Sequence, residues 1–454
     1  KRGAAMNQTR LIQPEDLSTQ EIFSMENLTN ACRQVRRNNG AAGVDGVKAR
    51  ELPVCPGEYW ERLREQILDR SYKPLPAKRT DIPKPDGSMR GLNVPAARDR
   101  VVQACLANYL DYRKDFEMSN SSYGFRKNRR CEQAILKGLE FMNDGYDWIV
   151  DIDLRKFFDT VDQDRLIRLI DNLFHNRDVT SLTRKFVRAG VMIDGRLVRT
   201  ERGIPQGGPL SPVLANIYLD QADKELESRG LRFTRYADDM LIYVKSEAAA
   251  NRVMKSFSNY LEKKLKLEVN ASKSKVARPD EVKYLGFGFK RNKREWKAIP
   301  HEKSIHEFEQ KIMKLTKRNW SVSLEERLEK INQVIRGWSN YFRCAWLYKK
   351  NMRKLDSKLR RRIRAIIWKQ WKSIRKKEES LIKLGCPRDK AHSYACARQG
   401  CVRCAVTFLN KYIRNIHLKK KGLLTIEEYF DTVAERFMKT FVRTAQCRTA
   451  RWVV

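Results

Sequence analysis

Two adjacent aspartates at the expected turn of a short hairpin constrain this chain more than any other feature. They are Asp238 and Asp239, in a Tyr-Ala-Asp-Asp string between the runs 231–235 and 240–244. Two extended runs around a tight connection predict strand, turn and strand. Adjacent carboxylates repel each other, and hard oxygen ligands of this kind suit Mg²⁺. Because Asp-Asp is also common in solvated turns, a metal site needs a partner carboxylate elsewhere in the chain.

A second pair of carboxylates closes an apolar stretch upstream, at residues 148–153. Side chains alternate along a strand, so Asp151 and Asp153 share one face. Charged groups on so apolar a strand are costly unless they are solvated, paired or bound to a metal. We favour Asp153 as the partner of Asp238 and Asp239 because it ends the strand, with Asp151 one strand period behind it. The alternative is that both residues form ion pairs with nearby Arg and Lys.

A loop rich in Gly and Pro spans residues 203–212 and precedes an expected helix. Ser211 is suited to cap that helix, and Pro212 to its first position. The glycines allow the backbone to approach a phosphate or a base closely. Taken alone, such a loop could precede any helix.

Together, these three segments resemble the palm of reverse transcriptases. The resemblance implies that Asp153, Asp238 and Asp239 are catalytic and bind two Mg²⁺ ions. It also implies that Gln206, in the Gly/Pro loop, contacts the incoming nucleotide.

Residues 78–95 hold a Pro-Asp-Gly turn between two extended runs, which predicts a hairpin bearing Lys84 and Arg90. In the family this hairpin closes on the nucleotide, so both residues are implied to contact its triphosphate. Arg126, in a Ser-Tyr-Gly-Phe-Arg string, is a further implied nucleotide contact. Phe158 matches the aromatic position that excludes a ribose 2′-OH. The alternative for Lys84 and Arg90 is a surface hairpin with solvated charges, and the alternative for Phe158 is an aromatic ring of the core.

Beyond the two aspartates, residues 247–267 predict an amphipathic helix. The resemblance then implies a catalytic lysine near the leaving pyrophosphate, Lys273, in an Asn-x-x-Lys-Ser pattern. It also implies that Tyr284 and Gly286, in a Tyr-Leu-Gly-Phe string, belong to a hairpin that grips the primer strand.

The composition indicates a polyanionic partner. The 454 residues hold 93 Lys and Arg against 55 Asp and Glu, a formal net charge of +38. Such an excess is typical of nucleic-acid binding. From His301 to Val454 there are 38 basic and 14 acidic residues. No apolar run approaches 18 residues, no signal peptide is apparent and ten cysteines are scattered, so we expect no membrane partner and a cytoplasmic, bacterial location.

Long helices are predicted over residues 303–375. A stripe of apolar residues recurs every three or four positions, which predicts one buried face: Leu328, Ile331, Ile335, Trp338 and Phe342. Between Arg353 and Lys377 there are 12 basic residues and one acid. The apolar residues between them are expected to face the protein: Leu355, Leu359, Ile363, Ile366, Ile367 and Ile374. The other side is then free for phosphates, unless it is merely a solvated face.

The string 335–342 resembles the thumb of intron maturases. The resemblance implies nucleic-acid contacts by four basic residues of this region: Arg336, Arg361, Arg362 and Arg364.

Cysteines cluster near the end of the chain. Cys396, Cys401 and Cys404 have partial zinc-like spacing, and Cys386 or His392 could complete four ligands. The alternative is that these small residues fill a helical core.

The resemblance covers nearly the whole chain and points to bacterial group II intron-encoded reverse transcriptases and maturases. The five histidines are too dispersed for an HNH endonuclease, as in the endonuclease-lacking IIC class. The implied fold is α+β, a right-hand polymerase with fingers and an antiparallel palm sheet, then a helical thumb and a small basic domain. The expected segments are an amino-terminal extension, fingers and palm, the thumb, and a basic DNA-binding-like domain, over residues 1–75, 76–300, 301–378 and 379–454.

The implied activity is RNA-directed DNA synthesis by two-metal nucleotidyl transfer, with assistance to intron splicing and mobility. The implied partners are group II intron RNA, an RNA template with a DNA or RNA primer, a DNA target and dNTPs. Two alternatives stay open: a protein that acts mainly as an RNA-binding splicing factor, and a domesticated enzyme of host repair or defence.

Overall fold

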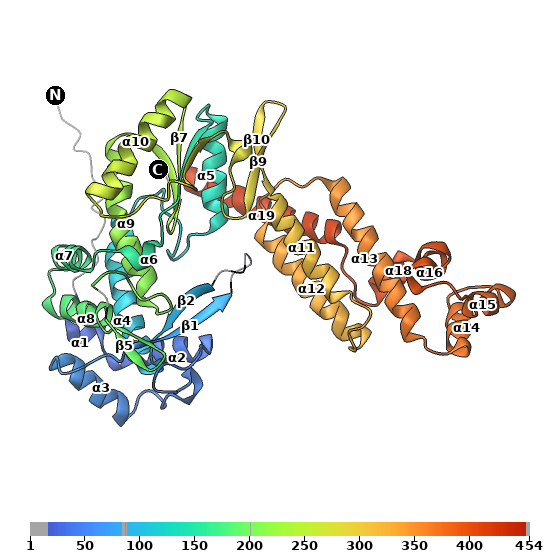
Figure 1. Cartoon of the computed structure of the whole chain (residues 1–454), viewed down its shortest axis with the longest axis horizontal. Helices are drawn as coiled ribbons and strands as arrows, with labels where there is room; N and C mark the ends of the chain where they lie inside the picture. Colours follow the sequence, from blue (N-terminus) through green and yellow to red (C-terminus); the bar gives the residue numbers. More distant parts are fainter. Residues whose placement is uncertain (1–16, 84–86, 88, 200, 451–454) are drawn as a thin grey trace. The chain divides into compact units, whose positions relative to one another are not determined.

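The computed structural model describes residues 17–83, 87, 89–199 and 201–450, with side chains described to residue 440 (Figure 1). The chain divides into two compact units, Lys1–Arg278 and Pro279–Val454, and each has a hydrophobic core of its own. This division differs from the four predicted segments. Residues 22–72 contribute to the same core as the first unit's sheet, and residues 279–300 belong to the second unit.

A four-stranded antiparallel sheet forms the centre of the first unit, as predicted for a palm. Its strand order is β6-β7-β3-β8. The strands are β3 (Trp148–Ile152), β6 (Arg232–Tyr236), β7 (Asp239–Val244) and β8 (Lys275–Ala277). Val150 and Ile152 face the main core, whereas Ile149 and Asp151 face the other side. The carboxylates are therefore on the side of the sheet that does not contribute to the main core.

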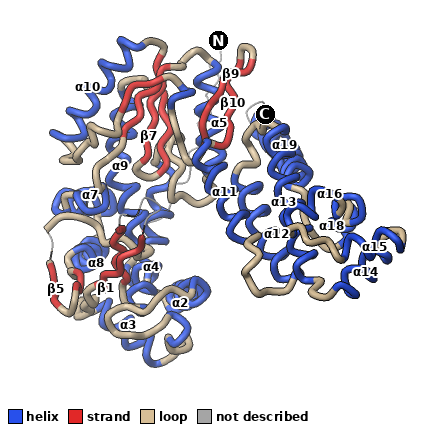
Figure 2. Tube along the Cα trace, turned by 45° about the vertical axis from the view of Figure 1, so that its right-hand side comes forward, coloured by secondary structure: helices blue, strands red, loops and turns tan. Residues whose placement is uncertain are grey.

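Helices lie on both sides of this sheet (Figure 2). On the core side are α9 (Leu210–Ser228) and α10 (Glu247–Lys263), which contribute Leu219 and Phe257 to the core. On the other side lies α5 (Cys131–Asn143), whose Phe141 ring packs 5.4 Å from that of Tyr243. The prediction that Ser211 caps α9 was wrong. The helix begins at Leu210, two residues before the predicted first position, Pro212, and the Ser211 hydroxyl donates to the carbonyl of Pro205 instead.

A second sheet in the first unit carries the predicted hairpin. Its strands are β1 (Ala77–Pro83), β2 (Met89–Val94), β4 (Val191–Ile193) and β5 (Arg196–Val198), in the order β2-β1-β4-β5. β1 and β2 pair antiparallel with Asp81 opposite Gly91, which confirms the hairpin. Lys84 lies outside the described residues.

Other helices of the first unit complete its core. They are α1 (Thr19–Ile22), α2 (Met25–Asn38), α3 (Glu58–Leu68), α4 (Ala97–Lys114), α6 (Phe157–Thr160), α7 (Gln163–Phe174) and α8 (Arg177–Val187). Polar side chains cap several of these helices at the position before the first helical residue. There they accept hydrogen bonds from first-turn backbone N–H groups that have no partner within the helix. Ser24, Asp162 and Asn176 do so for α2, α7 and α8.

The second unit begins with an antiparallel hairpin and continues as helices. Its elements are β9 (Phe287–Asn292), β10 (Glu295–Pro300), α11 (Glu302–Leu315), α12 (Leu324–Tyr341), α13 (Lys349–Gln370), α14 (Ile374–Lys383), α15 (Arg388–Ala395), α16 (Cys401–Thr407), α17 (Leu409–Tyr412), α18 (Asn415–Lys420) and α19 (Ile426–Ala450). The stripe predicted on α12 is buried at Leu328, Ile331 and Ile335. Ile374 does not join the predicted apolar side, because it starts α14 and is 50% exposed.

Among the described residues, no helix has both the length and the apolar content that a membrane crossing requires.

Candidate functional site

The two adjacent aspartates lie at a two-residue turn between β6 and β7. Tyr236 pairs with Asp239, so Ala237 and Asp238 form the turn itself. Ala237 has a φ of 57°, in the left-handed region that a residue with a Cβ adopts at a cost of roughly 1–2 kcal/mol. Such turns are common in hairpins because they match the strand twist, and they usually contain Gly. Side-chain and packing contacts must therefore hold this conformation.

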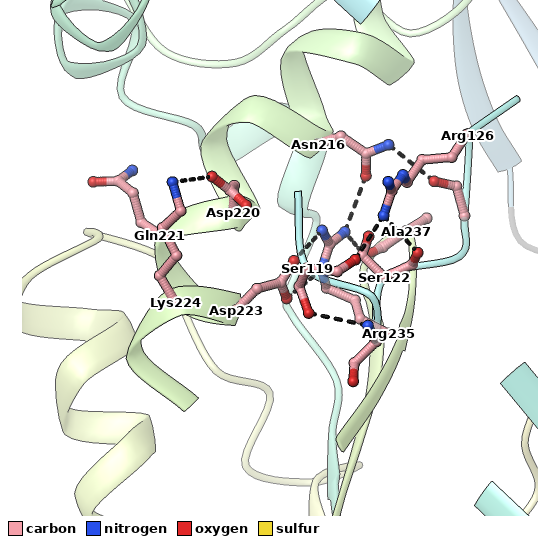
Figure 3. Close-up of polar contacts among 12 residues, drawn as sticks. Ser119, Ser122, Arg126, Asn216, Asp220, Gln221, Asp223, Lys224, Arg235 and Ala237 are labelled. Atoms are coloured by element: carbon pink, nitrogen blue, oxygen red, sulfur yellow. Dashed lines mark hydrogen bonds and ion pairs between the residues drawn. The ribbon is translucent and has the colours of Figure 1, made fainter. Parts of the chain in front are cut away.

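Arg235 supplies the main contact of this kind (Figure 3). Its guanidinium donates 2.7 and 2.5 Å bonds to the two carboxylate oxygens of Asp223 on α9, and both side chains are fully buried. The same group donates to Asn216 Oδ1 and to the carbonyl oxygen of Ala237, each at 3.0 Å. The Arg235 guanidinium thus links the turn to α9. Its charge-assisted hydrogen bonds hold the turn more strongly than those of a neutral side chain would.

The loop before α5 closes over the same turn. Gly124 lies so near that a Cβ built on it would be 2.2 Å from the backbone nitrogen of Ala237. Its carbonyl accepts a 2.9 Å bond from Asn216 Nδ2, which also links it to Arg235. The Ser-Tyr-Gly-Phe-Arg string therefore supports the aspartate turn from the side.

Asp153 follows the end of β3 and is held by the segment after α10. Its Oδ2 accepts a 2.8 Å bond from Asn270 Nδ2, and its backbone N–H donates to Ser274 Oγ at 3.0 Å. The ammonium of Lys273 lies 3.9 Å from the same Oδ2. The structure thus brings Lys273 close to Asp153.

The carboxylates act on one another electrostatically. Burial raises the pKa of Asp238, and Asp153 raises it further, against the opposing effect of Arg90 and Arg235. Although Asp239 is open to solvent at its edge, loss of hydration and the charges of Asp238, Asp151 and Asp153 raise its pKa to about 6. Burial likewise raises the pKa of Asp151 to about 6. Neighbouring carboxylates disfavour one another's ionised forms, and a bound cation would relieve this repulsion.

The chemistry of these donors fits Mg²⁺. Asp153, Asp238 and Asp239 provide hard oxygen ligands at one end of the sheet, on a partly solvated surface. Within the described residues, no three His, Cys, Asp or Glu side chains already stand in the arrangement of a metal site. These three carboxylates would therefore have to converge on an ion when it binds.

Two residues predicted to contact the nucleotide, Arg90 and Gln206, lie in the hairpin and the Gly/Pro loop near these carboxylates. Arg90 Nε and Nη2 donate to Gln206 Oε1 at 3.2 and 3.1 Å, and Arg90 acts on the charge of Asp238. The backbone of Gln206 accepts a bond from Asn93 N–H. Phe158 is half-buried against Phe157, with ring centroids 5.3 Å apart. Four predicted residues, Arg90, Gln206, Phe158 and Lys273, thus keep an accessible part.

Arg126 has a different position from the predicted one. It is buried, and its guanidinium donates to the Asp115 carboxylate and to the carbonyls of Asp115, Ser119 and Ser122. Because protein oxygens already accept hydrogen bonds from this guanidinium, Arg126 stabilises the loop that contains Gly124. A direct triphosphate contact is inconsistent with this arrangement.

Two predicted contacts in the second unit are also buried. Arg364 on α13 donates to the carbonyl of Ile413 and to Asn415 Oδ1, so it packs α13 against the following helices. Tyr284 is 3% exposed at the base of the β9–β10 hairpin. Gly286, with a φ of 79°, stays partly exposed beside it.

Other basic residues of the second unit are accessible. Arg336 and Arg361 are exposed, and Arg362 is half-buried with donors to Thr316 Oγ1 and to backbone carbonyls. Arg361 and Arg362 share a cavity of about 200 Å³ with Arg318 and Lys358. This concentration of positive charge agrees with the expected phosphate-binding face.

The cysteine cluster does not form the predicted zinc site. Cys386 and Cys404 are buried, and Cys404 donates to the carbonyl of Gln399. Cys396 contacts only His392 among the candidate ligands, at 3.7 Å. Over the described residues, no group of three potential ligands is arranged to hold a metal ion. The cysteines therefore follow the alternative prediction, since Cys404 fills the core of the second unit.

Comparisons with known proteins agree with this geometry. Residues 82–289 match the family described as reverse transcriptase (RNA-dependent DNA polymerase), and residues 305–383 match the group II intron, maturase-specific domain. Protein YkfC of Escherichia coli is 30% identical over 295 residues, which are 56% of this chain and 77% of that protein. The chain belongs to the reverse transcriptase family. As a reverse transcriptase with a maturase-specific domain, it has nucleic acids as partners and uses a divalent metal ion.

Other relatives of this reverse transcriptase come from introns. The group II intron-encoded protein LtrA of Lactococcus lactis is 32% identical over 205 residues, 45% of this chain and 34% of that protein. The putative COX1/OXI3 intron 1 protein of Saccharomyces cerevisiae is 35% identical over 237 residues, 47% of this chain and 28% of that protein. The chain thus spans about a third of these two relatives. A telomerase structure from Candida albicans aligns over 87% of this chain and 67% of its own, at 13% identity and a TM-score of 0.43.

The residues that support this reverse transcriptase's aspartates were not among the predicted site residues. They are Arg235, Asp223, Asn216 and Asn270. One signal was available for Arg235, because an arginine inside an apolar strand needs a buried partner. The identity of that partner, 12 residues upstream on a helix, depends on the fold.

We expect Gly124→Ala to lower the rate of DNA synthesis at least about tenfold, because the added methyl group displaces the aspartate turn. Overpacking of this kind costs roughly 1–3 kcal/mol. Steady-state primer extension and thermal melting measure both effects. Gly400→Ala is the matched control, since a Cβ at Gly400 meets no atom within 4 Å. Equal behaviour of the two variants would contradict a tight contact at Gly124.

Proposed function

We propose that this protein copies RNA into DNA at Asp153, Asp238 and Asp239, and that it assists the splicing and mobility of the group II intron that encodes it. The observation that supports the polymerase site is that Asp153 lies near enough to the turn for its charge to raise the pKa values of Asp238 and Asp239. Lys273 lies beside Asp153, and the charge of Arg90 acts on Asp238. Such a site suits the transfer of a nucleotidyl group from a dNTP to a primer end.

In this proposal, Asp153, Asp238 and Asp239 would hold two Mg²⁺ ions, whose positive charge would favour ionisation of the primer 3′-OH and offset the charge of the triphosphate. Arg90, with its fork near Gln206, binds the phosphates, and Lys84 of the same hairpin assists it. Phe158 limits the space beside the sugar and favours deoxynucleotides.

The reaction joins the primer 3′-oxygen to the α-phosphorus and breaks the bond to the β-phosphate, so that pyrophosphate leaves. We expect Lys273 to give a proton to this leaving group. The 3.9 Å distance between its ammonium and Asp153 Oδ2 supports this role. Asn270 holds the Asp153 carboxylate in orientation by its 2.8 Å bond. Base pairing with the template selects the nucleotide.

Primer extension tests this function. The full chain is incubated with a DNA primer on an RNA template, dNTPs and Mg²⁺, and product length is followed with time. We expect full-length cDNA. Tight RNA binding without any product would contradict the polymerase proposal and would favour the second candidate function.

The second candidate is an RNA-binding splicing factor, which the maturase-specific domain at residues 305–383 favours. Its proposed partner is intron RNA, and its test is splicing of the cognate precursor with and without the protein. The DNA target, the endonuclease-lacking IIC class, and the cytoplasmic, bacterial location stay predictions.

We also expect RNA binding to weaken steeply with salt, because a chain of net charge +38 displaces many counterions from its partner. A protein that neutralises six to ten phosphates loses roughly 10³- to 10⁵-fold in affinity between about 50 and 200 mM salt. Filter binding over this range measures the slope. A flat response would contradict phosphate binding by the basic second unit.

A further inference from the structure

A large cavity lies between the β9–β10 hairpin and the segment that joins α12 to α13. Its volume is about 870 Å³, within the roughly 300–1,000 Å³ of ligand pockets. Trp346 anchors this segment, because its backbone N–H donates to the carbonyl of Ala298 on β10 at 2.7 Å. The cavity shares no lining residue with the groove beside Gly286, where the primer strand is expected.

Aromatic rings and cations line this cavity together. Trp346 and Tyr348 are 38% and 37% exposed, with ring centroids 4.6 Å apart at an interplanar angle of 63°. The ammonium of Lys290 lies 5.1 Å from the Tyr348 ring centroid. Arg291 and Lys350 add two further positive charges to the lining.

Two carboxylates, Asp280 and Glu302, also line the cavity, so its charge is positive but small. A site for phosphate alone would have no need of exposed rings, and an apolar site would not combine them with three cations. Exposed rings beside cations are typical of proteins that bind single-stranded nucleic acid, because each ring stacks on an unpaired base while the cations follow the backbone. Bases inside a duplex cannot reach such rings, since they already stack on one another.

We propose that this cavity binds unpaired bases of single-stranded RNA, with Trp346 and Tyr348 as the stacking platform and Lys290, Arg291 and Lys350 along the phosphates. The proposal rests on the proposed function in one respect, namely that RNA is the partner. The cavity is lined by residues of the second unit, whereas the carboxylates of the proposed polymerase site belong to the first. We therefore expect the protein to prefer RNA with an unpaired stretch.

The test compares binding of the full chain to an unstructured single-stranded RNA and to an RNA duplex of the same length, over a range of salt. We expect Trp346→Ala to weaken single-strand binding about tenfold, the scale of one stacked base, with an unchanged salt slope. Lys290→Gln should instead reduce that slope by about one, as expected for one phosphate contact. A single-stranded DNA of the same sequence shows whether the 2′-OH contributes.

Two variants separate stacking from folding. Trp346→Phe keeps a ring and should retain most of the affinity, whereas Phe116→Ala removes an exposed ring that lies beside acidic residues and should change nothing. If Trp346→Ala and Tyr348→Ala both bind single strands like the wild type, or lose duplex binding equally, the proposal is wrong. If single-strand binding depends on these rings but the protein extends no primer, the polymerase proposal is wrong and the proposal of this RNA site is retained.

Discussion

Replacing Asp238 with Asn is expected to abolish DNA synthesis while RNA binding stays nearly unchanged. The substitution keeps the size of the side chain and removes the charge at the tip of the β6–β7 turn, where Asp238 lies next to Asp239 and interacts with Asp153. Losing one electrostatic contact to a reacting group typically costs 10²- to 10³-fold in rate, so we expect a loss of at least about 10²-fold. Single-turnover primer extension measures it.

RNA binding by Asp238→Asn should remain within about twofold of the wild type, because one charge is small beside the many phosphate contacts expected of a chain with net charge +38. Asp194→Asn is the matched control, since this exposed carboxylate lies in the β4–β5 turn. Equal loss of binding and synthesis in Asp238→Asn would refute this division between the catalytic turn and the RNA-binding surface.

The second large effect is expected at the buried pair of Arg235 and Asp223. Asp223→Asn leaves the Arg235 guanidinium without its charged partner in a site that water does not reach. Breaking one partner of a buried pair costs roughly 3–5 kcal/mol, so the melting temperature should fall. The maximal rate of primer extension should fall as well, because Arg235 also holds the carbonyl of Ala237. Arg235→Lys keeps the charge but loses the fork, and should recover only part of the rate.

A double substitution separates stability from positioning. Asp223→Leu combined with Arg235→Met replaces the ion pair by apolar groups, a change that is often neutral or stabilising. We expect the melting temperature to recover while the maximal rate stays low, because no donor then holds the left-handed turn at Ala237. The Michaelis constant for the nucleotide should change less than the maximal rate. Full recovery of both rate and stability would show that the pair only stabilises the fold.

Much of the fold was predictable because its signals are local. The alternating strand that ends at Asp153, the Pro-Asp-Gly hairpin and the apolar stripe of α12 each follow from residues close together in sequence. The resemblance placed these segments in one architecture. The antiparallel sheet and the helical second unit confirm that prediction.

The incorrect predictions share one physical cause. The family resemblance implied that Arg126 and Arg364 contact a ligand, but tertiary contacts supply protein acceptors that satisfy both guanidinium groups. The cysteine spacing suggested zinc, yet helix packing buries Cys386 and Cys404 and brings no third ligand to Cys396 among the described residues. Spacing along the chain does not fix the direction in which a helical side chain points.

The sequence by itself determined three features: the Asp-Asp pair at the turn, the carboxylate at the end of an apolar strand, and the excess of basic residues that indicates a nucleic-acid partner. Only the tertiary structure decided what holds that turn. Ala237 takes a left-handed conformation because Arg235, Asp223 and Gly124 meet there from three separate segments. Local preference disfavours that conformation, and the buried charge pair and close packing that stabilise it exist only once these segments have come together.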